Sequence, residues 1–367
     1  MQILEQLAFG MDDNVTIENI VVECNSIQGY LECMVDIEQM DIVVESIDLK
    51  ATVKKILIFI KSIFEKMKNL FNKFVSFIRN IGKKSANSNK TVADTIDSMS
   101  KNGAFSSETV SNNVKDNVSK LYGMSTDNIP KIEQMTKRDV TEMIINSIKY
   151  SGPSYDCIAQ AAAHISTIVT VISNEMEWID IIQSHASKGG LSTIGEMGLK
   201  TDVSDVCRDI KRKIIQYNPI LAVYLDDFGD ISTPEDIQRF LEYIINRTLS
   251  VRKGYITINQ VCDGVKYVDL KLLHDNVDSL TKRMDSIKDG INKFNIAIKS
   301  CNNPNVQFDD ALIQEYRAIN NISNIHLMVS TKILSSVSKC MVIINTHASR
   351  FEEFIKELND KISIYMK

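Results

Sequence analysis

The chain of 367 residues is long enough for two or three domains, and its 44% hydrophobic and 24% charged residues are ordinary for a folded protein. Its net charge is −5, but the charge is unevenly distributed along the chain, because residues 1–50 carry −10 and residues 51–84 carry +8. The other 283 residues carry only −3, which argues against a body built to hold nucleic acid. Seven scattered cysteines without a Cys-x-x-Cys pair indicate reduced thiols rather than disulfides or a zinc site.

Residues 1–50 form an acidic N-terminal extension. They hold eleven carboxylates against the single cation Lys50, and they lack the cationic start of a secretory signal. The longest charge-free apolar stretch, residues 157–174, contains glutamine, histidine, serine and threonine, which favours a buried helix over a membrane span. We therefore expect neither a signal peptide nor a transmembrane helix.

A basic amphipathic helix is predicted over residues 51–84. At about 100° per residue, its apolar and cationic side chains fall on opposite faces, and its nine lysines and arginines outnumber a single glutamate, Glu65. This helix is the candidate surface for binding a partner or a membrane. Its apolar candidates are Ile56, Ile60, Ile63, Phe64, Met67, Phe71, Phe74 and Ile78, and its cationic candidates are Lys54, Lys55, Lys61, Lys66, Lys73 and Arg79.

Three interpretations of this helix stay open. Its apolar face can dock on the helical body of the protein, with the lysines in water. A face with seven cations and one anion is also typical of helices that lie on an anionic membrane surface. The third interpretation is an acidic protein partner or a nucleic acid. Residues 1–50 are then an internal candidate, because their own apolar residues could cover the helix like a prosegment.

Residues 85–130 are rich in serine, asparagine, threonine and aspartate and poor in large apolar residues. This composition predicts a polar linker with at most short helices. The apolar spacing becomes regular after Pro130, and residues 131–250 are expected to form a helical bundle.

Within that bundle, the spacing predicts helices over residues 140–148, 158–182 and 203–217. A fourth helix is predicted from capping signals. Thr233 is the N-cap, Pro234 occupies the first helical position and Asp236 supplies a carboxylate at the third, so the helix should run to about Thr248.

Residues 251–367 are predicted to form a long helical hairpin. Apolar residues from Leu270 to Ile298 alternate gaps of three and four, which is the seam of a coiled coil. A second helix of over 50 residues should begin near Asp309 and return antiparallel to the first. Before them, Asp263-Gly264 lies between β-leaning runs, so residues 255–268 would allow a small β-hairpin.

The chain shows no motif for catalysis or cofactor binding. The glycine-rich string from Gly190 to Thr201 lacks the lysine that must follow the second glycine of a phosphate loop. The five histidines have no partners at metal-ligand spacing, and no nucleophile elbow or serine triad order is visible. We expect no enzyme activity, no catalytic residues, no metal, no cofactor and no small-molecule substrate.

The expected fold is all-α, an elongated helical bundle with a long C-terminal antiparallel coiled-coil-like hairpin. The acidic, methionine-punctuated N-terminus, the run Val53-Lys54-Lys55-Ile56-Leu57-Ile58-Phe59-Ile60-Lys61 leading into a Lys/Phe-rich helix, the polar linker and the long helices resemble virion-associated, structural or internal helical proteins of large tailed bacteriophages with AT-rich genomes. The resemblance covers roughly residues 30–85.

That resemblance implies a capsid or internal head protein, found in the host cytoplasm during assembly and then in the virion, with virion components or further copies of itself as partners. In such proteins an acidic leader is removed by a head-maturation protease that cuts after glutamate, but here Glu32, Glu38 and Glu45 lie in different sequence contexts and form no tandem cleavage signature. The alternative function is a membrane-interacting or permeabilising protein that becomes active when residues 1–50 are removed.

Overall fold

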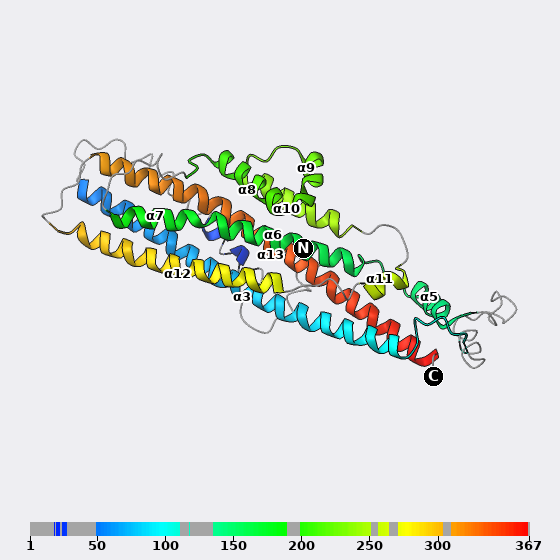
Figure 1. Cartoon of the computed structure of the whole chain (residues 1–367). Helices are drawn as coiled ribbons and strands as arrows, with labels where there is room; N and C mark the ends of the chain where they lie inside the picture. Colours follow the sequence, from blue (N-terminus) through cyan, green and yellow to red (C-terminus); the bar gives the residue numbers. More distant parts are fainter. Residues whose placement is uncertain are drawn as a thin grey trace. The chain divides into compact units, whose positions relative to one another are not determined.

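The computed structural model describes residues 18, 20–22, 24–27, 49–110, 117, 135–188, 199–250, 256–263, 271–303 and 310–365. Within these ranges the secondary structure is helical, with one isolated antiparallel bridge between Thr109 and Thr136 and no strand (Figure 1). The prediction of an all-α fold is therefore confirmed. In chain order, the helices are α3 (Leu49–Lys101), α5 (Lys137–Ser147), α6 (Tyr155–Glu175), α7 (Glu177–Lys188), α8 (Val203–Tyr217), η5 (Pro219–Leu221), α9 (Ala222–Phe228), α10 (Pro234–Thr248), α11 (Ile258–Asp263), α12 (Lys271–Ser300) and α13 (Asp310–Tyr365).

The chain divides into two compact units. Unit 1 takes its residues from Met1–Asn80, His164–Ile245 and Lys271–Val342, and unit 2 takes its residues from Ile81–Ala163, Asn246–Leu270 and Ile343–Lys367. In unit 1, aromatic side chains of α3, α7 and α12 meet in the core. In unit 2, Tyr150, Tyr155 and Phe354 surround Phe351 of α13, with ring centroids 4.9–5.9 Å apart.

Helix α3 contains the predicted basic helix and continues beyond it to Lys101. The linker prediction is therefore wrong for residues 85–101. Val92, Ile96 and Met99 are spaced by four and three and are buried, so this polar stretch still has an apolar stripe. The helix ends in a Schellman motif, in which Gly103 has a φ of 80° and the amide of Ala104 bonds the carbonyl of Met99 at 3.0 Å.

The β-hairpin prediction is also wrong where the structure describes it. Residues 258–263 form the short helix α11, and residues 264–268 lie outside the described residues. The cause is a capping box, because the amide of Gln260 donates to Thr257 Oγ1 at 3.3 Å and the Gln260 side chain accepts from the Thr257 amide at 3.0 Å. The Thr-x-x-Gln capping signal for a helix therefore outweighs the Asp-Gly signal for a hairpin turn.

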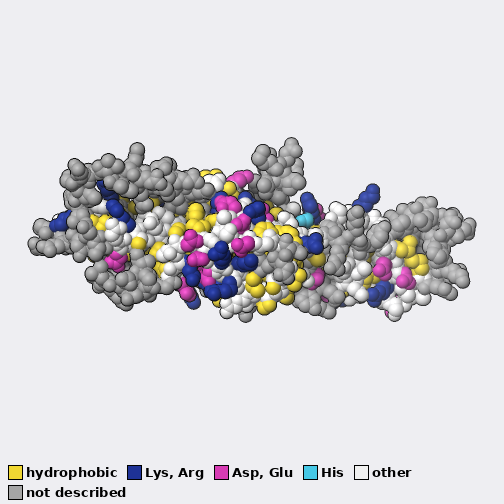
Figure 2. All heavy atoms as spheres, turned by 90° about the horizontal axis from the view of Figure 1, so that it is seen from above, with side chains coloured by type: hydrophobic (Ala, Val, Ile, Leu, Met, Phe, Trp, Pro, Cys, Tyr) yellow, Lys and Arg dark blue, Asp and Glu magenta, His cyan; other side chains and the backbone are white. Residues whose placement is uncertain are grey.

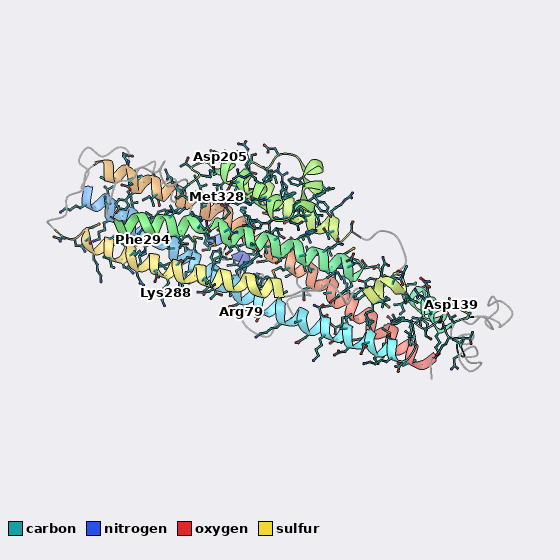
Figure 3. The ribbon with its side chains drawn as sticks, viewed as in Figure 1. Arg79, Asp139, Asp205, Lys288, Phe294 and Met328 are labelled. Carbon is teal, nitrogen blue, oxygen red and sulfur yellow. The ribbon has the colours of Figure 1, made fainter. Side chains whose placement is uncertain are left out.

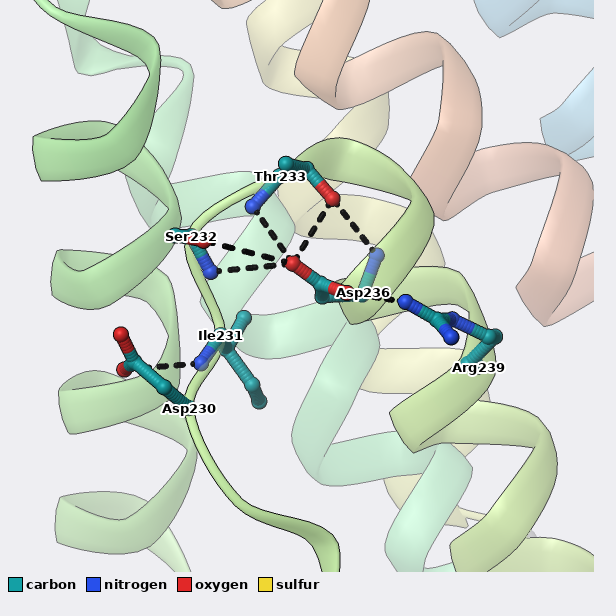
Figure 4. Close-up of polar contacts among 6 residues, drawn as sticks. All are labelled: Asp230, Ile231, Ser232, Thr233, Asp236 and Arg239. Atoms are coloured by element: carbon teal, nitrogen blue, oxygen red, sulfur yellow. Dashed lines mark hydrogen bonds and ion pairs between the residues drawn. The ribbon is translucent and has the colours of Figure 1, made fainter.

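Helix α10 begins and ends where its capping signals predicted (Figure 4). The Asp236 amide donates to Thr233 Oγ1 at 3.2 Å, and Asp236 Oδ2 accepts from the Thr233 amide at 2.9 Å. The Ser232 amide also donates to this carboxylate, and Arg239 pairs with its other oxygen. These bonds satisfy amides that the first helical turn leaves without partners.

The two long C-terminal helices are present at the expected lengths, 30 residues for α12 and 56 for α13. The neighbours that the structure shows for α12 are α7 and α3. In the view of Figure 1, α7 lies between α12 and α13. Direct pairing of α12 with α13 as a hairpin therefore stays a prediction.

Two helical stretches, Tyr155–Ile182 and Ile313–Ile364, are long and apolar enough to cross a membrane by length and composition alone. This is weak evidence for a span, because core helices of soluble proteins share both properties. Inside the structure, 61% and 67% of their apolar windows are buried.

Candidate interaction surface on helices α3 and α12

The apolar face of the basic helix is buried inside unit 1. Phe64 packs edge-on against Trp178 of α7 and Phe294 of α12, with ring centroids 6.0 and 5.1 Å away. Seven of the eight apolar candidates are at most 1% exposed, and Ile56 is half-buried. The seven are Ile60, Ile63, Phe64, Met67, Phe71, Phe74 and Ile78. Of the three interpretations, docking on the helical body is the one that the structure shows, and the seven buried residues form no exposed binding surface in this fold.

The buried arc of α3 is wider than the predicted stripe. Leu57, Leu70, Val75 and Phe77 are also buried, and at 100° per residue the buried positions cover an arc of about 160°. A helix lying on one flat surface would bury a narrower stripe. Helix α3 therefore has packing neighbours on both flanks of its apolar face.

The burial of α3 is too strong for its release from a folded unit. A fully buried Ile, Phe or Met contributes about 1.5–3 kcal/mol, so the seven candidates together contribute roughly 10–20 kcal/mol as an upper estimate. Whole domains are stable by about 5–15 kcal/mol. Exposing this face to a membrane would consequently require unit 1 to unfold, which removes the geometric support for a permeabilising helix.

The cationic candidates lie along the exposed side of α3. Lys55 and Arg79 are exposed, whereas Lys54, Lys61, Lys66 and Lys73 are half-buried. Lys54 Nζ donates to Asn302 Oδ1 at 3.0 Å, and Arg79 donates to Thr281 Oγ1 at 3.4 Å. Lys61 pairs with Glu65 at 3.4 Å. These bonds align α3 antiparallel to α12, because Lys54 meets Asn302 just beyond the C-terminal end of α12 and Arg79 meets Thr281 in its N-terminal half.

Helix α12 adds cations that the sequence interpretation missed. Phe294 lies on the side of α12 that faces α7, and Lys288 lies on the opposite side (Figure 3). Lys282, Lys288 and Lys299 are exposed. Together, residues 49–80 of α3 and residues 281–300 of α12 carry thirteen cationic and three anionic side chains, a net charge of +10. We call these two segments the α3–α12 cationic surface.

The missed residues had a sequence signal, because they occupy outward positions between the seam residues of α12. No sequence signal showed that these lysines lie next to α3, since periodicity does not identify which helices are neighbours.

The face that carries α8 and α10 has a different charge pattern. Lys, Arg, Asp and Glu side chains are intermingled there (Figure 2). Lys213 pairs with Glu175 and, at 3.0 Å, with Asp209. Arg208 pairs with Asp205 at 3.5 Å. Mixed signs of this kind are ordinary for a solvated surface, which distinguishes it from the α3–α12 cationic surface.

Part of the acidic extension belongs to the core of unit 1. Residues 18, 20–22 and 24–27 are helical, and Ile20, Cys24 and Ile27, spaced by four and three, are at most 3% exposed. Val22, on the other side, is exposed. The extension is thus a folded contributor at this point, and Glu32, Glu38 and Glu45 lie outside the described residues.

The buried histidines act as core residues. His326 stacks on Trp178 with ring centroids 5.5 Å apart, and burial lowers its pKa to about 4. Burial also lowers the pKa values of His164 and His347. Across the part of the chain that the structure describes, no group of three or more His, Cys, Asp or Glu side chains could hold a metal ion.

Comparison with protein-family models finds no match to this chain, and comparisons with curated proteins and with solved structures find none either.

Proposed function

We propose that this is a non-enzymatic structural or interaction protein that binds an extended anionic partner through the α3–α12 cationic surface. The carrying observation is the burial of the apolar side of α3, which leaves a net charge of +10 on two neighbouring helical segments of a chain whose total charge is −5. Following the resemblance drawn from the sequence, we further propose that the protein is virion-associated, and that it enters the particle after synthesis in the host cytoplasm.

The spacing of the cations supports binding to an extended anionic surface. Lysines three to seven residues apart along a helix are separated by about 5–10 Å, which is close to the screening length of about 8 Å at physiological salt. Their potentials therefore add. Of the thirteen cations only Arg79 and Arg283 are arginines, and lysine is a mobile point charge without the rigid fork that selects one planar anion. Binding should thus depend on charge density more than on one specific group.

The acidic extension supports a regulatory element of the proposal. It carries −10, and its residues Ile20, Cys24 and Ile27 are buried in the same unit that carries the cationic surface. An acidic segment in the same chain has a high effective concentration near the cationic surface, so it competes with any anionic partner for that surface. Neutralising the carboxylates of the extension, which leaves the buried Ile20, Cys24 and Ile27 in place, should therefore increase affinity for that partner.

Heparin affinity of the full chain tests the proposal. Five cations of this surface are replaced by glutamine: Lys55, Arg79, Lys282, Lys288 and Lys299. The variant should elute at a lower salt concentration, because each cation lost reduces the number of counterions that binding releases, and with it the affinity. A matched control changes five exposed, acid-paired cations elsewhere to glutamine: Lys101, Arg208, Arg212, Arg239 and Lys356. Equal elution of the two variants would refute a dedicated surface. Absence of the protein's peptides from purified particles would refute the virion assignment.

A further inference from the structure

We infer that the partner of the α3–α12 cationic surface is an anionic lipid membrane, on which the folded protein lies peripherally. This inference rests on the proposed function and names its partner. It starts from two large apolar side chains that this otherwise charged surface leaves exposed: Ile58 of α3, which is 48% exposed, and Ile296 of α12, which is 66% exposed.

The two isoleucines lie in the same stretch of the helix pair. The Lys54–Asn302 hydrogen bond and the Phe64–Phe294 contact mark its two ends. Ile58 lies between Lys54 and Phe64 on one helix, and Ile296 lies between Phe294 and Asn302 on the other. A segment of ten helical residues is about 15 Å long, so both isoleucines lie within about 15 Å of each other along the helix axes.

Cations surround this area on both helices. Lys55 and Lys61 flank Ile58, and Lys293 and Lys299 flank Ile296. A few aliphatic side chains within a ring of lysines match the boundary between headgroups and acyl chains of an anionic bilayer, because the lysines neutralise phosphate while the isoleucines enter the apolar layer. Each lysine near such a surface increases affinity about fivefold. Each isoleucine that enters it adds about tenfold.

The chemistry of this surface fits lipid better than nucleic acid. Proteins that bind single strands stack bases on exposed aromatic rings, and proteins that read duplexes favour arginine. Among the described side chains, the large hydrophobic residues exposed on α3 and α12 are both isoleucines, which have no ring for stacking. The apolar face of α3 stays buried in unit 1, so this mode of binding requires no unfolding and should leave the bilayer intact.

The experiment uses the full chain and flotation of vesicles made of phosphatidylcholine alone or with 30% phosphatidylglycerol. We expect binding to the anionic vesicles, and an affinity at least tenfold lower for the double variant Ile58→Asn, Ile296→Asn. The matched control is Ile220→Asn with Val223→Asn, because these two side chains are even more exposed but lie on η5 and α9. The control should bind like the unchanged protein, and a dye enclosed in the vesicles should stay inside.

The outcomes separate this inference from the proposed function. Retention on heparin without binding to anionic vesicles would overturn the lipid assignment and leave the proposed function standing. Equal binding by the Ile58/Ile296 variant, or tighter binding to a 30-base-pair duplex than to vesicles, would also overturn it. If the full chain binds neither heparin nor vesicles, the proposed function itself fails.

Discussion

Phe64 is the residue at which three helices of unit 1 meet, since its ring contacts Trp178 of α7 and Phe294 of α12. Replacing it by alanine should lower the free energy of unfolding of unit 1 by about 3–5 kcal/mol, because the cavity adds to the lost burial. Urea unfolding measures the change. Ile58→Ala, on the exposed side of the same helix, is the control and should stay within about 0.5 kcal/mol. Similar losses for both would show that α3 is not oriented as described.

His326 should make stability depend on pH. Burial against Trp178 lowers its pKa to about 4, while a hydrogen bond that the imidazole donates to the Lys200 backbone and the charge of Asp209 oppose this shift and Lys213 adds to it. The unfolded side chain titrates near 6.5. The unfolded state therefore takes up the proton first, and stability falls as pH decreases from about 6.5 to about 4, by up to roughly 3 kcal/mol.

His326→Phe keeps a ring against Trp178 and removes the titrating group. The free energy of unfolding of this variant, measured by urea titration at several pH values, should fall less steeply below pH 6.5. Some slope will remain because burial lowers the pKa values of His164 and His347 as well. An unchanged slope would mean that His326 is protonated equally in both states.

At the scale of elements, α10 depends on its capping box. Hydrogen bonding, first from the Thr233 side chain and then from the Ser232 amide, lowers the pKa of Asp236 to about 2. Thr233→Ala should reduce the free energy of unfolding by about 1 kcal/mol, since an amide of the first turn loses its acceptor. Thr233→Ser keeps the hydroxyl and is the matched control. Because the folded pKa of Asp236 lies below its unfolded value, this stabilisation is present above about pH 4 and is lost as pH falls toward 2.

Local signals predicted some elements well and failed where two signals competed. Helix α10 was predicted to its ends because Thr233, Pro234 and Asp236 all favour the same start. Near residue 260, the Asp-Gly dipeptide favoured a hairpin and Thr257 with Gln260 favoured a helix, and the helix formed. Over residues 85–101, polar composition concealed a stripe formed by Val92, Ile96 and Met99.

The candidate surface was predicted in part. The period of α3 correctly separated buried from exposed residues, as Phe71 and Arg79 show. The sequence could not decide among the three interpretations of its apolar side, because amphipathicity shows that a face needs cover and does not show what covers it. The cover includes α7 and α12, which are more than a hundred residues away in the sequence. The packing of α12 against α3 also places the lysines of α12 on the same surface.

At the scale of the whole molecule, the described residues of the acidic extension belong to unit 1. Ile27 is fully buried, so Ile27→Ala should cost about 2–5 kcal/mol of unfolding free energy. Val22→Ala, on the exposed side of the same short helix, should change it by less than about 0.5 kcal/mol. Thermal unfolding of the two variants compares them. Equal stabilities would indicate a detachable leader that contributes nothing to the fold.

The central claim is that unit 1 is built around the apolar side of α3 and presents its lysine side outward. The most direct measurement is the thermal unfolding of the double variant Phe71→Glu, Phe74→Glu beside that of Asn69→Glu, Asn72→Glu, which places the same charges on exposed positions of the same helix. Two buried, unpaired carboxylates should abolish the cooperative transition of unit 1, while the control keeps its midpoint. If the phenylalanine variant instead unfolds at the midpoint of the unchanged protein, the apolar side of α3 is a free surface and this account is wrong.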